Sequence, residues 1–584
     1  DQRKLNSEGE WSEQRSRRYF TTASVNANTS LAEAEDNEEM SDSLSVEDAA
    51  KSTMQQHQVT LCLNDTCRKT TRCTCEQPHP VTLYQVESTQ TSSSGHRSEA
   101  VTMLVQCCRC NDKPRIKGTE IATELSISSN PPISVLVNEL YRQLPESTRD
   151  EARSKPGKGR KLLTFYDSRQ GAARFAAYLQ DIVNQDLYRY LVPTAVTRLV
   201  EKLGRLPDFE EVSAQCIEIG WGELQVFQND LEVENVERGK RRLTQADKAR
   251  LDTIIKKRVL AELTTNRRGR QSLEALGLIV ISHFEETPNV SDLARAIGLT
   301  AKQTALLVEY LLETLRTAKA ILLPEGVDPD DKVFGRNQSN PKVVRGNAGT
   351  GEIPWVGKTE RHSRCRLIRR MLEHAKRPTD DGDVRRVAEA IWAWLIDQEV
   401  FVGSASDGYQ LSLSHIFLNT PKSDWYRCEK CQRLRHDAGD LPCPHPTCGG
   451  HLMDVDLEEI GERNYYRKIL SHKMIPLRVE EHTAQLDSEK GRMYQNLFKR
   501  GDINVLSCST TFEMGIDLGD LQAVFLNNVP PTVANYRQRS GRAGRRAGGA
   551  AFIVTWSTDR PHDQQYFSDP ASIIRGQVRV PRVQ

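Results

Sequence analysis

Three short apolar runs near the C-terminal end constrain the fold of this chain more than any other feature. Residues 503–508, 523–526 and 550–556 are rich in apolar β-branched and aromatic side chains. Runs of this kind are typical of strands that are buried inside a sheet of an α/β protein. The C-terminal part of the chain is therefore predicted to form an α/β lobe.

An Arg- and Gly-rich stretch, Gln-Arg-Ser-Gly-Arg-Ala-Gly-Arg over residues 538–545, lies between the last two runs. Arg542 and Arg545 are three positions apart on a helix start that the glycines loosen, so both guanidinium groups can reach one anionic group. That geometry suits the γ-phosphate of a nucleotide bound on a facing domain, where positive charge stabilises the transferred phosphoryl group. Gln538, Arg542 and Arg545 are the predicted catalytic residues. The alternative is a solvated Arg-Gly-rich loop.

The segment that begins with the first apolar run reads INVLSCSTTFEMGIDLG over residues 503–519. It resembles motif V of superfamily 2 helicases, and the Arg-rich stretch resembles their motif VI. The motif V form is closest to that of Lhr-type and MrfA-type helicases, although Ser509 stands where the family usually has Thr. The resemblance implies two sets of site residues. Gly515, Asp517, Gly541 and Gly544 would couple ATP to the nucleic acid, and Ser509 and Thr510 would hold backbone phosphates.

Residues 160–176 read as a strand, a turn and a helix. The predicted strand spans residues 162–165, and either Asp167 or Ser168 can cap the helix that follows. The segment resembles motif IV, the start of the second RecA-like lobe of these helicases. Ser168 and Arg169 are therefore predicted to hold a nucleic-acid phosphate at the helix N-terminus. An ordinary βα unit is the alternative.

The sequence contains no Gly-x4-Gly-Lys-Ser/Thr loop, which would cradle phosphates in a first RecA-like lobe. Asp150–Arg153 imitates an acidic helicase box, but it follows a polar run and is interpreted as a solvated helix turn. The chain is thus expected to carry the arginine-finger half of a composite ATPase site. ATP and Mg²⁺ would be shared with a first RecA-like lobe from the parent chain or a partner subunit. Both ends of the sequence are interpreted as cut from a larger motor.

Clustered cysteines predict zinc. Two knuckles, Cys428-x2-Cys431 and Cys443-x4-Cys448, offer four thiolates for a closed structural Zn²⁺ site, with His436, His445 and His451 as nearby alternatives. A second, N-terminal cluster holds seven cysteines. Its predicted zinc ligands are Cys62, Cys67, Cys107 and Cys110. Cys73 or Cys75 could replace either Cys62 or Cys67. The isolated cysteines, Cys216, Cys365 and Cys508, are predicted to be core residues.

Residues 289–313 have the rhythm of a helix-turn-helix, with Gly298 at the turn, and resemble part of a winged-helix domain. The second helix could read DNA, with Lys302 and Gln303 as its polar readers, or could serve only in packing. This unit belongs to a set of domains, nearly 280 residues long, inserted inside one α/β lobe.

The predicted organisation follows the chain in nine segments. They are a flexible polar segment (1–55), a cysteine-rich zinc module (56–125), the start of the second RecA-like lobe with motif IV (130–195), a helical insertion (196–270), a winged-helix-like unit (271–325), a helical and linker insertion (326–424), a zinc ribbon (425–453), the remainder of the lobe with motifs V and VI (470–567), and the start of a further C-terminal region (568–584).

The net charge of +1 gives no overall basic field, so nucleic-acid binding must depend on local basic faces. No apolar run is long enough to span a membrane, and a cytoplasmic protein is expected. The combined motifs resemble large bacterial superfamily 2 helicases of the MrfA-like group, which includes phage-defence helicases of the DISARM and Druantia systems. The resemblance implies an ATP-driven DNA translocase or helicase component, with RNA as another possible substrate and other defence-complex subunits as partners. A DNA-binding scaffold that never meets ATP, or a fragment of a DNA-repair helicase, is the alternative.

Overall fold

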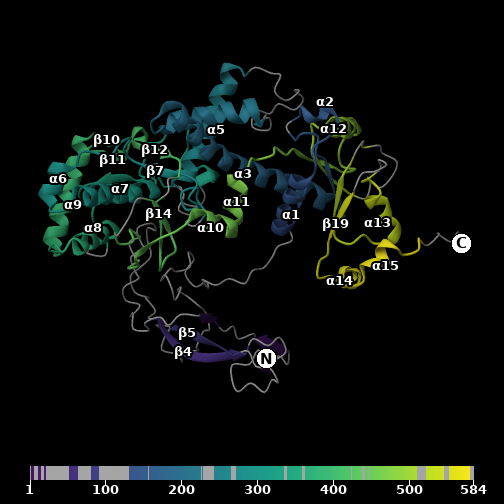
Figure 1. Cartoon of the computed structure of the whole chain (residues 1–584), viewed down its shortest axis with the longest axis horizontal. Coiled ribbons are helices and arrows are strands. Elements are labelled where there is room, and N and C mark those ends of the chain that lie inside the picture. The colour runs from purple at the N-terminus through teal and green to yellow at the C-terminus, as the bar shows by residue number, and fades with distance from the viewer. Residues whose placement is uncertain are drawn as a thin grey trace.

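The computed structural model is shown in Figure 1. It describes residues 130–155, 157–224, 226–227, 243–264, 271–334, 339–357, 362–421, 424–436, 441–445, 448–509, 518, 521–544 and 551–578. Nearer the N-terminus it gives the backbone of five strands: β1 (Gln2–Leu5), β2 (Trp11–Gln14), β3 (Tyr19–Thr21), β4 (Ser52–Cys62) and β5 (Pro80–Gln90). Strand β1 pairs with β2, and β5 pairs with both β3 and β4, all antiparallel. Three of these strands fall within residues 1–55, where the sequence predicts a flexible polar segment.

A five-stranded parallel sheet forms the lobe that the apolar runs predict. Its order is β16-β17-β6-β18-β19, and each neighbouring pair is parallel. The strands are β6 (Leu162–Tyr166), β16 (Val479–His482), β17 (Val505–Cys508), β18 (Ala523–Asn527) and β19 (Phe552–Trp556). Strand β6 lies between two strands from the far end of the sequence, so the sheet closes only when the segments on both sides of the insertion meet.

Helices cover both faces of this sheet. Helices α1 (Asn130–Gln143) and α3 (Arg169–Leu203) lie on one face, where Tyr141 and Phe175 pack against Leu162 and Phe525. On the other face, α12 (Ser488–Arg500) contributes Phe498 to a core with Leu163, Phe165 and Leu526. Alternate residues of β6 therefore enter opposite cores, as the pleat of a strand requires. Burial of each large apolar side chain stabilises the lobe by roughly 1.5–3 kcal/mol.

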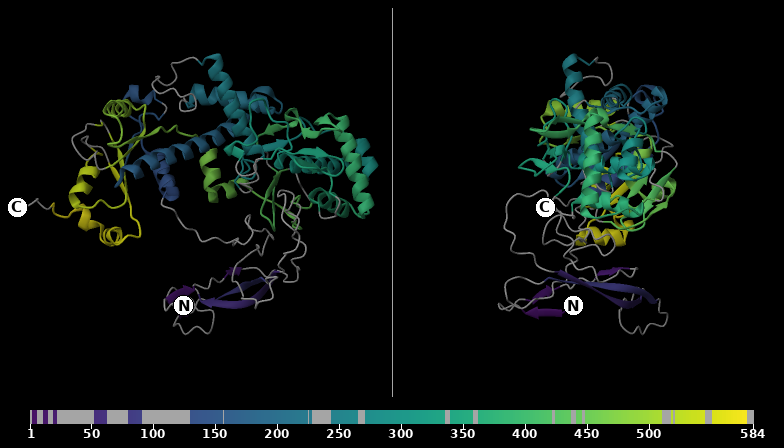
Figure 2. Two further views of the ribbon diagram at one scale, coloured as in Figure 1. Left: turned by 180° about the vertical axis from the view of Figure 1, so that it is seen from behind. Right: turned by 90° about the vertical axis from the view of Figure 1, so that its left-hand side faces the viewer.

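Helix α3 is 35 residues long and leads out of the lobe into the insertion (Figure 2). At 1.5 Å per residue it spans roughly 50 Å. It begins at the Ser168 N-cap and ends at Gly204, whose φ of 69° allows the left-handed C-cap. Pro193 lies inside the helix and removes one backbone donor without ending it. The lobe boundary predicted at residue 195 therefore falls within a continuous helix.

The insertion is mostly helical and has one large apolar core. Its helices are α4 (Phe209–Glu218), a π turn (Ile219–Glu223), α5 (Gln245–Thr264), α6 (Ser291–Ile297), α7 (Ala301–Thr317), a 3-10 turn (Lys332–Phe334), α8 (Ser363–His374), α9 (Asp381–Asp397) and a second 3-10 turn (Leu413–His415). Sequence patterning also predicts helices here.

The insertion contains strands as well, which the sequence does not predict because each has only three or four residues. A four-stranded sheet has the order β10-β11-β8-β9, and β7 pairs with β12. Their bounds are β7 (Val280–Ser282), β8 (Lys342–Val344), β9 (Glu352–Pro354), β10 (Phe401–Ser404), β11 (Gly408–Leu411) and β12 (Phe417–Asn419). Residues 326–424 therefore hold a small sheet beside their helices.

The remaining described elements lead back to the lobe and beyond it. A three-stranded antiparallel sheet, order β14-β13-β15, consists of β13 (Trp425–Cys428), β14 (Leu434–His436) and β15 (Leu452–Asp454). The helices are α2 (Asp150–Arg153), α10 (Leu457–Arg463), α11 (Tyr465–Ser471), α13 (Val533–Ser540), α14 (Pro561–Ser568) and α15 (Pro570–Ile574). Among the residues that the structure describes, no helix is long and apolar enough to cross a membrane.

Candidate functional site

The candidate site lies at the carboxyl edge of the parallel sheet. Phe165 of β6 is in register with Cys508 of β17 and with Leu526 of β18, so these three strands end side by side. The segments that follow the strands carry the residues of motifs IV, V and VI. In open α/β sheets this edge is where ligands bind, because loops from neighbouring strands converge there.

The turn after β6 begins helix α3 with a side-chain cap. The backbone N–H of Gly171 donates a hydrogen bond to Ser168 Oγ at 3.0 Å, so Ser168 is the cap and Asp167 is not. A cap of this kind stabilises a helix by about 1 kcal/mol. Ser168 and Arg169 are both exposed at the positive end of a long helix. The predicted phosphate contacts therefore stand at a terminus that favours an anion.

Asp167 forms an ion pair with Arg539, which the sequence does not predict. Its Oδ1 lies 3.0 Å from Nη1 of Arg539, and the Arg539 side chain is completely buried. The guanidinium group also lies over the Phe165 ring, 5.6 Å from its centre. Arg539 belongs to the Arg-rich stretch, but only its neighbours Gln538, Arg542 and Arg545 fit the pattern of a phosphate sensor. No signal in the sequence indicates the pairing, because the two residues are 372 positions apart.

Helix α13 carries the first part of motif VI. Gln538 is exposed in its last turn, and Arg542 follows the helix end with only 5% of its surface exposed. Burial raises the pKa of the Cys508 thiol well above its usual value, and the positive charge of Arg542 opposes that rise. Ala543, the residue after Arg542, packs against the apolar core that includes Cys508, the last residue of β17. Arg545, the second predicted finger, lies outside the described residues.

The glycines of motif VI differ in their roles. Gly541 is exposed and ends α13, its N–H donating to the carbonyl oxygen of Arg537 at 2.9 Å. Gly544 has a φ of 71°, and a Cβ there would lie 2.7 Å from the Cβ of Ala551. The chain can make this turn only with glycine, because both the backbone angle and the space exclude a side chain. Gly544 N–H donates to Leu521 O at 3.0 Å and holds the turn against the segment that leads into β18.

Motif V is described only at its edges. Ser509 directly follows β17 and is fully buried, and Leu518 is also buried. Thr510, Gly515 and Asp517 lie outside the described residues. Their roles in coupling ATP to nucleic acid therefore stay predictions.

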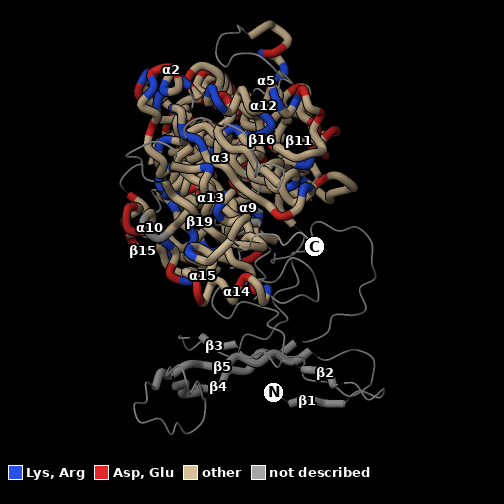
Figure 3. The backbone as a smooth tube through the Cα atoms, turned by 90° about the vertical axis from the view of Figure 1, so that its right-hand side faces the viewer, with Lys and Arg blue, Asp and Glu red and all other residues tan. Residues whose placement is uncertain are grey.

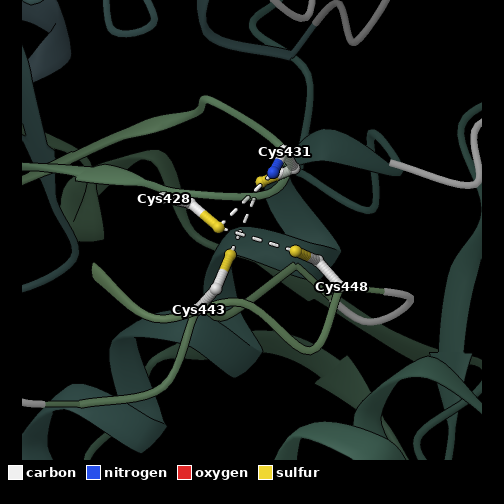
Figure 4. A group of neighbouring side chains, drawn as sticks. All are labelled: Cys428, Cys431, Cys443 and Cys448. Carbon is white, nitrogen blue, oxygen red and sulfur yellow. Dashed lines mark hydrogen bonds between the residues drawn. The ribbon is translucent and has the colours of Figure 1, made fainter. Parts of the chain in front are cut away.

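Four cysteines of the zinc ribbon converge on one point (Figure 4). The Sγ atoms of Cys428, Cys431, Cys443 and Cys448 all lie within 4.8 Å of one another and are buried. The Cys428–Cys448 and Cys431–Cys443 sulfur distances are both 3.6 Å, close to the roughly 3.8 Å edge of a tetrahedron with 2.3 Å Zn–S bonds. They are much longer than the ~2.05 Å of a disulfide. The donor set therefore fits Zn²⁺, and thiolates rather than the nearby histidines form the group.

The backbone around the cluster is shaped to receive it. Cys431 N–H lies 3.5 Å from Cys428 Sγ, within reach of an N–H to sulfur hydrogen bond. A Cβ at Gly450 would lie 2.6 Å from the same sulfur, so this position must stay without a side chain. The other predicted zinc ligands lie outside what the structure describes. Cys62 ends β4 with its side chain undescribed, and Cys67, Cys107 and Cys110 are not described at all.

The cysteine ribbon is anchored to the insertion by buried charges. Arg435 of β14 donates to both carboxylate oxygens of Glu313 on α7, at 3.0 Å each. Burial alone would raise the pKa of Glu313, but the guanidinium groups of Arg435 and Arg316 outweigh burial and lower it. Ribbon and insertion are thus joined by an ionised pair, which is costly to break in a buried setting.

The predicted helix-turn-helix is present as α6, Gly298 and α7. Gly298 adopts a φ of 73° at the turn, and Arg377 donates to its carbonyl oxygen at 2.7 Å. Most of α7 is covered by the rest of the insertion, and only its first turn, with Lys302, is exposed. Its acidic residue Glu309 accepts hydrogen bonds from the Ser282 hydroxyl and the His283 N–H. This geometry favours a packing role for α7, and a complete winged-helix domain is not established.

Two sequence segments resemble nucleotide-binding motifs, but the structure shows a single helical turn in one and a strand in the other. Asp150–Arg153 forms the exposed single turn α2, as predicted. Residues 351–359 read Gly-x5-Gly-Lys-Thr, one residue longer than a phosphate-binding loop, and were not predicted as a site. Residues 352–354 of this segment form strand β9, and Ile353 and Trp355 enter the core of the insertion. That part is a buried strand and cannot wrap a phosphate group.

The parallel sheet, with arginine-bearing α13 at its carboxyl edge, has the architecture of a RecA-like helicase C-terminal lobe. Residues 458–547 match the family model described as "Helicase conserved C-terminal domain". These residues therefore form a helicase C-terminal domain, and the chain is similar to helicases of several kinds.

Individual relatives match different shares of the chain. Druantia protein DruE of Escherichia coli (strain UMEA 4076-1) is 26% identical over 77% of this chain and 25% of its own length. ATP-dependent helicase HRQ1 of Saccharomyces cerevisiae is 34% identical over 15% of this chain and 8% of its own length. The crystal structure of the DUF1998 helicase MrfA bound to DNA and AMPPNP matches at 24% identity, with a TM-score of 0.16, over 20% of this chain and 15% of that one. The chain thus spans a quarter or less of the length of these proteins.

Proposed function

We propose that this chain supplies the C-terminal motor lobe of an ATP-dependent DNA translocase or helicase. The observation that carries the proposal is the position of Arg542, which is buried at the edge where β6 and β18 end. The next residue, Ala543, packs against the core that includes Cys508 at the end of β17. A buried arginine at this edge, next to an exposed helix N-terminus, suits a lobe that faces both a nucleotide and a nucleic-acid strand. Several relatives are named ATP-dependent helicases, including HRQ1 and Lhr-Core.

In this proposal the arginines stabilise charge on the transferred phosphoryl group. ATP with Mg²⁺, held mainly by a first RecA-like lobe of the parent chain or a partner, supplies that group. Arg542 and Arg545 approach it from this chain, and Gln538 helps to orient the reacting groups. An arginine in this role accelerates phosphoryl transfer by about 10³–10⁵ in other systems. Gly515, Asp517, Gly541 and Gly544 would transmit the state of the nucleotide to the nucleic-acid track.

The nucleic-acid track would begin at the N-terminus of α3. Ser168 and Arg169 are exposed there, and free N–H groups at a helix start bind phosphate oxygens. Ser509 and Thr510, after β17, would extend the track, and the fully buried Ser509 would reach a phosphate only after the segment that follows it moves. In the view of Figure 3, basic and acidic residues are interspersed over the described part of the chain, so binding would depend on such local contacts. We propose that the bound nucleic acid is DNA. Tighter binding of an RNA oligonucleotide than of the same DNA sequence would favour RNA.

We also propose that the four-cysteine cluster binds one Zn²⁺ in a structural role. Four thiolates leave no open coordination position, so a metal held there would brace the ribbon and would not take part in catalysis. The N-terminal cysteine cluster is proposed as a second zinc site. The similarity to DruE across 77% of this chain supports a role in anti-phage defence alongside other subunits.

The test is DNA-stimulated ATP hydrolysis, measured for this chain alone and for the natural full-length protein that contains it. Activity in the full-length protein but not in the chain would support a composite ATPase site. Activity in neither would favour a second candidate, a DNA-binding scaffold with a RecA-like fold. A DNA-repair helicase would show the same ATPase activity, and loss of phage resistance in a deletion strain would separate it from a defence function.

A further inference from the structure

One ion pair joins the two halves of the candidate site. Arg539 projects from α13, the helix that precedes Arg542, and its Nη1 lies 3.0 Å from Oδ1 of Asp167. Asp167 directly precedes Ser168, the cap of α3. The helix proposed to sense the nucleotide is therefore tied, side chain to side chain, to the turn proposed to hold nucleic acid.

The two side chains of this ion pair differ in their exposure to solvent. The Arg539 side chain is 0% exposed, whereas the Asp167 side chain is 36% exposed. The guanidinium group lies over the Phe165 ring of β6, one residue before the end of that strand. A second element also approaches the carboxylate, because Asn528 Nδ2, after β18, lies 3.5 Å from Asp167 Oδ2. Asp167 thus contacts the segments after β18 while it belongs to the turn after β6.

Separating a buried guanidinium group from its carboxylate partner is costly, because removal of one member of a buried ion pair is strongly destabilising. A displacement of α13 is therefore expected to carry Asp167 with it. Because Asp167 and Ser168 are consecutive, the displacement reaches the α3 N-cap directly. The exposed side of the carboxylate leaves room for the turn to move against solvent.

We propose that the Arg539–Asp167 ion pair is a positioning contact that couples the nucleotide-facing helix α13 to the nucleic-acid-facing turn at the start of α3. The inference rests on the proposed function, because it gives a role to a contact between the two proposed binding regions. Neither residue touches the nucleotide or the nucleic acid in this scheme. They determine how strongly nucleic acid changes the rate of ATP hydrolysis.

The experiment compares Asp167→Asn with wild type in the natural full-length protein. The substitution keeps the size of the side chain and removes its charge. ATP hydrolysis is measured without nucleic acid and across a titration of a single-stranded oligonucleotide. We expect the basal rate to stay within about twofold while the maximal stimulation falls by about tenfold. Asp167→Glu, which keeps the carboxylate, is expected to restore at least half of the stimulation.

The matched control is Glu262→Gln. Glu262 also forms a buried 3.0 Å ion pair with an arginine, Arg189 of α3, but deep in the insertion. We expect this variant to keep wild-type stimulation, even if its melting temperature falls as much as that of Asp167→Asn. Circular dichroism melting curves of all variants measure the loss of stability separately from the loss of coupling.

Three results would overturn the inference. Equal reduction of basal and stimulated rates in Asp167→Asn would show that the pair is only structural. Equal loss of stimulation in Glu262→Gln would show that any lost ion pair has this effect. Absence of ATPase activity in the wild-type full-length protein would reject the proposed function and the coupling role together, and this outcome is distinct from the first two. If Asp167→Asn does not fold, the same comparison is made with Arg539→Lys. This substitution keeps the positive charge and replaces the guanidinium group by an ammonium group with fewer N–H donors.

Discussion

Nη1 of Arg370 lies 2.6 Å from the carbonyl oxygen of Cys443, a member of the four-cysteine cluster. The same nitrogen lies 2.9 Å from the carbonyl oxygen of His445. Arg370 belongs to α8, so the second cysteine knuckle is held by a helix of the insertion. Together with the Arg435–Glu313 pair, this contact makes the ribbon part of the insertion rather than an independent module.

Substitution of Cys443 by Ser should remove the metal from the ribbon. Loss of one thiolate breaks a four-ligand site, and the knuckle would then no longer present the carbonyl oxygen that Arg370 binds. We expect zinc content, measured by inductively coupled plasma mass spectrometry, to fall by about one ion per chain. The melting temperature should fall by roughly 5 °C or more, because metal binding contributes to folding.

The control for this prediction is Cys365→Ser. Cys365 is a buried cysteine of α8 outside the cluster, so its replacement can lower stability without changing the zinc content. Equal zinc content in wild type and Cys443→Ser would show that the cluster does not bind the metal.

Replacement of Arg542 by Ala should abolish ATP hydrolysis in the natural full-length protein. We expect a loss of about 10³-fold in kcat, since the finger acts on the transition state rather than on nucleotide binding. Oligonucleotide binding, measured by fluorescence anisotropy, should stay within about threefold of wild type. A kcat near the wild-type value would remove Arg542 from the catalytic set.

Arg537→Ala provides the comparison on the same helix. Arg537 is exposed on α13 and donates to the carbonyl oxygen of Gly576 at 2.9 Å, on the C-terminal side of the lobe. Its loss removes one positive charge from α13 without removing a predicted finger. ATP hydrolysis in this variant should therefore remain near the wild-type rate.

Gly544→Ala should destabilise the lobe for two reasons. The backbone φ of 71° disfavours a side chain, and the new Cβ would lie 2.7 Å from that of Ala551. The first effect alone costs about 1 kcal/mol, and the clash adds to it. Gly204→Ala isolates the first effect, because Gly204 has a φ of 69° and no atom within 4 Å of the added Cβ. Urea unfolding should show the larger loss for Gly544→Ala, and equal losses would mean that the turn relaxes.

The stability of the lobe should fall as the pH falls below about 6.5, partly because of His482. Burial lowers the pKa of His482 below its ordinary value of 6.5, and its Nε2 lies 3.2 Å from the Gly491 carbonyl oxygen. The unfolded chain therefore takes up the proton first, so the folded state loses stability as the pH falls from 6.5 towards the folded pKa. His482→Gln should reduce this pH dependence in thermal melts between pH 8 and pH 5. An unchanged slope would contradict the assignment to His482.

The sequence predicts four strands of the lobe well, because β6, β17, β18 and β19 are largely apolar runs beside recognisable motifs, whereas β16 reads Val-Glu-Glu-His. The predicted strand at residues 162–165 becomes β6. Cysteine spacing likewise predicts the converging thiols, since two knuckles on tight turns have few other arrangements. The buried positions of Cys216, Cys365 and Cys508 are also confirmed.

Contacts between distant residues could not be predicted in the same way. The Arg539–Asp167 pair depends on sheet order, which brings the turn after β6 beside the segment after β18. The short strands of the insertion escape prediction because three or four residues show no periodicity. The burial of α7 depends on α8, which packs against it from a segment that begins 46 residues after α7 ends (363 − 317).

The order of the sheet has a consequence for the synthesis of the protein. The Thr164 hydroxyl of β6 donates a hydrogen bond to the Leu506 carbonyl oxygen of β17 at 3.4 Å, although the two residues are 342 positions apart. A ribosome adding ~5–20 residues per second needs roughly 20–70 s to supply that intervening length. During this time β6 waits without either neighbouring strand while the insertion has all of its own core residues and can fold first. The newly made strand is thus a natural client for a chaperone, and a nascent chain stalled within the insertion should be unusually prone to aggregation.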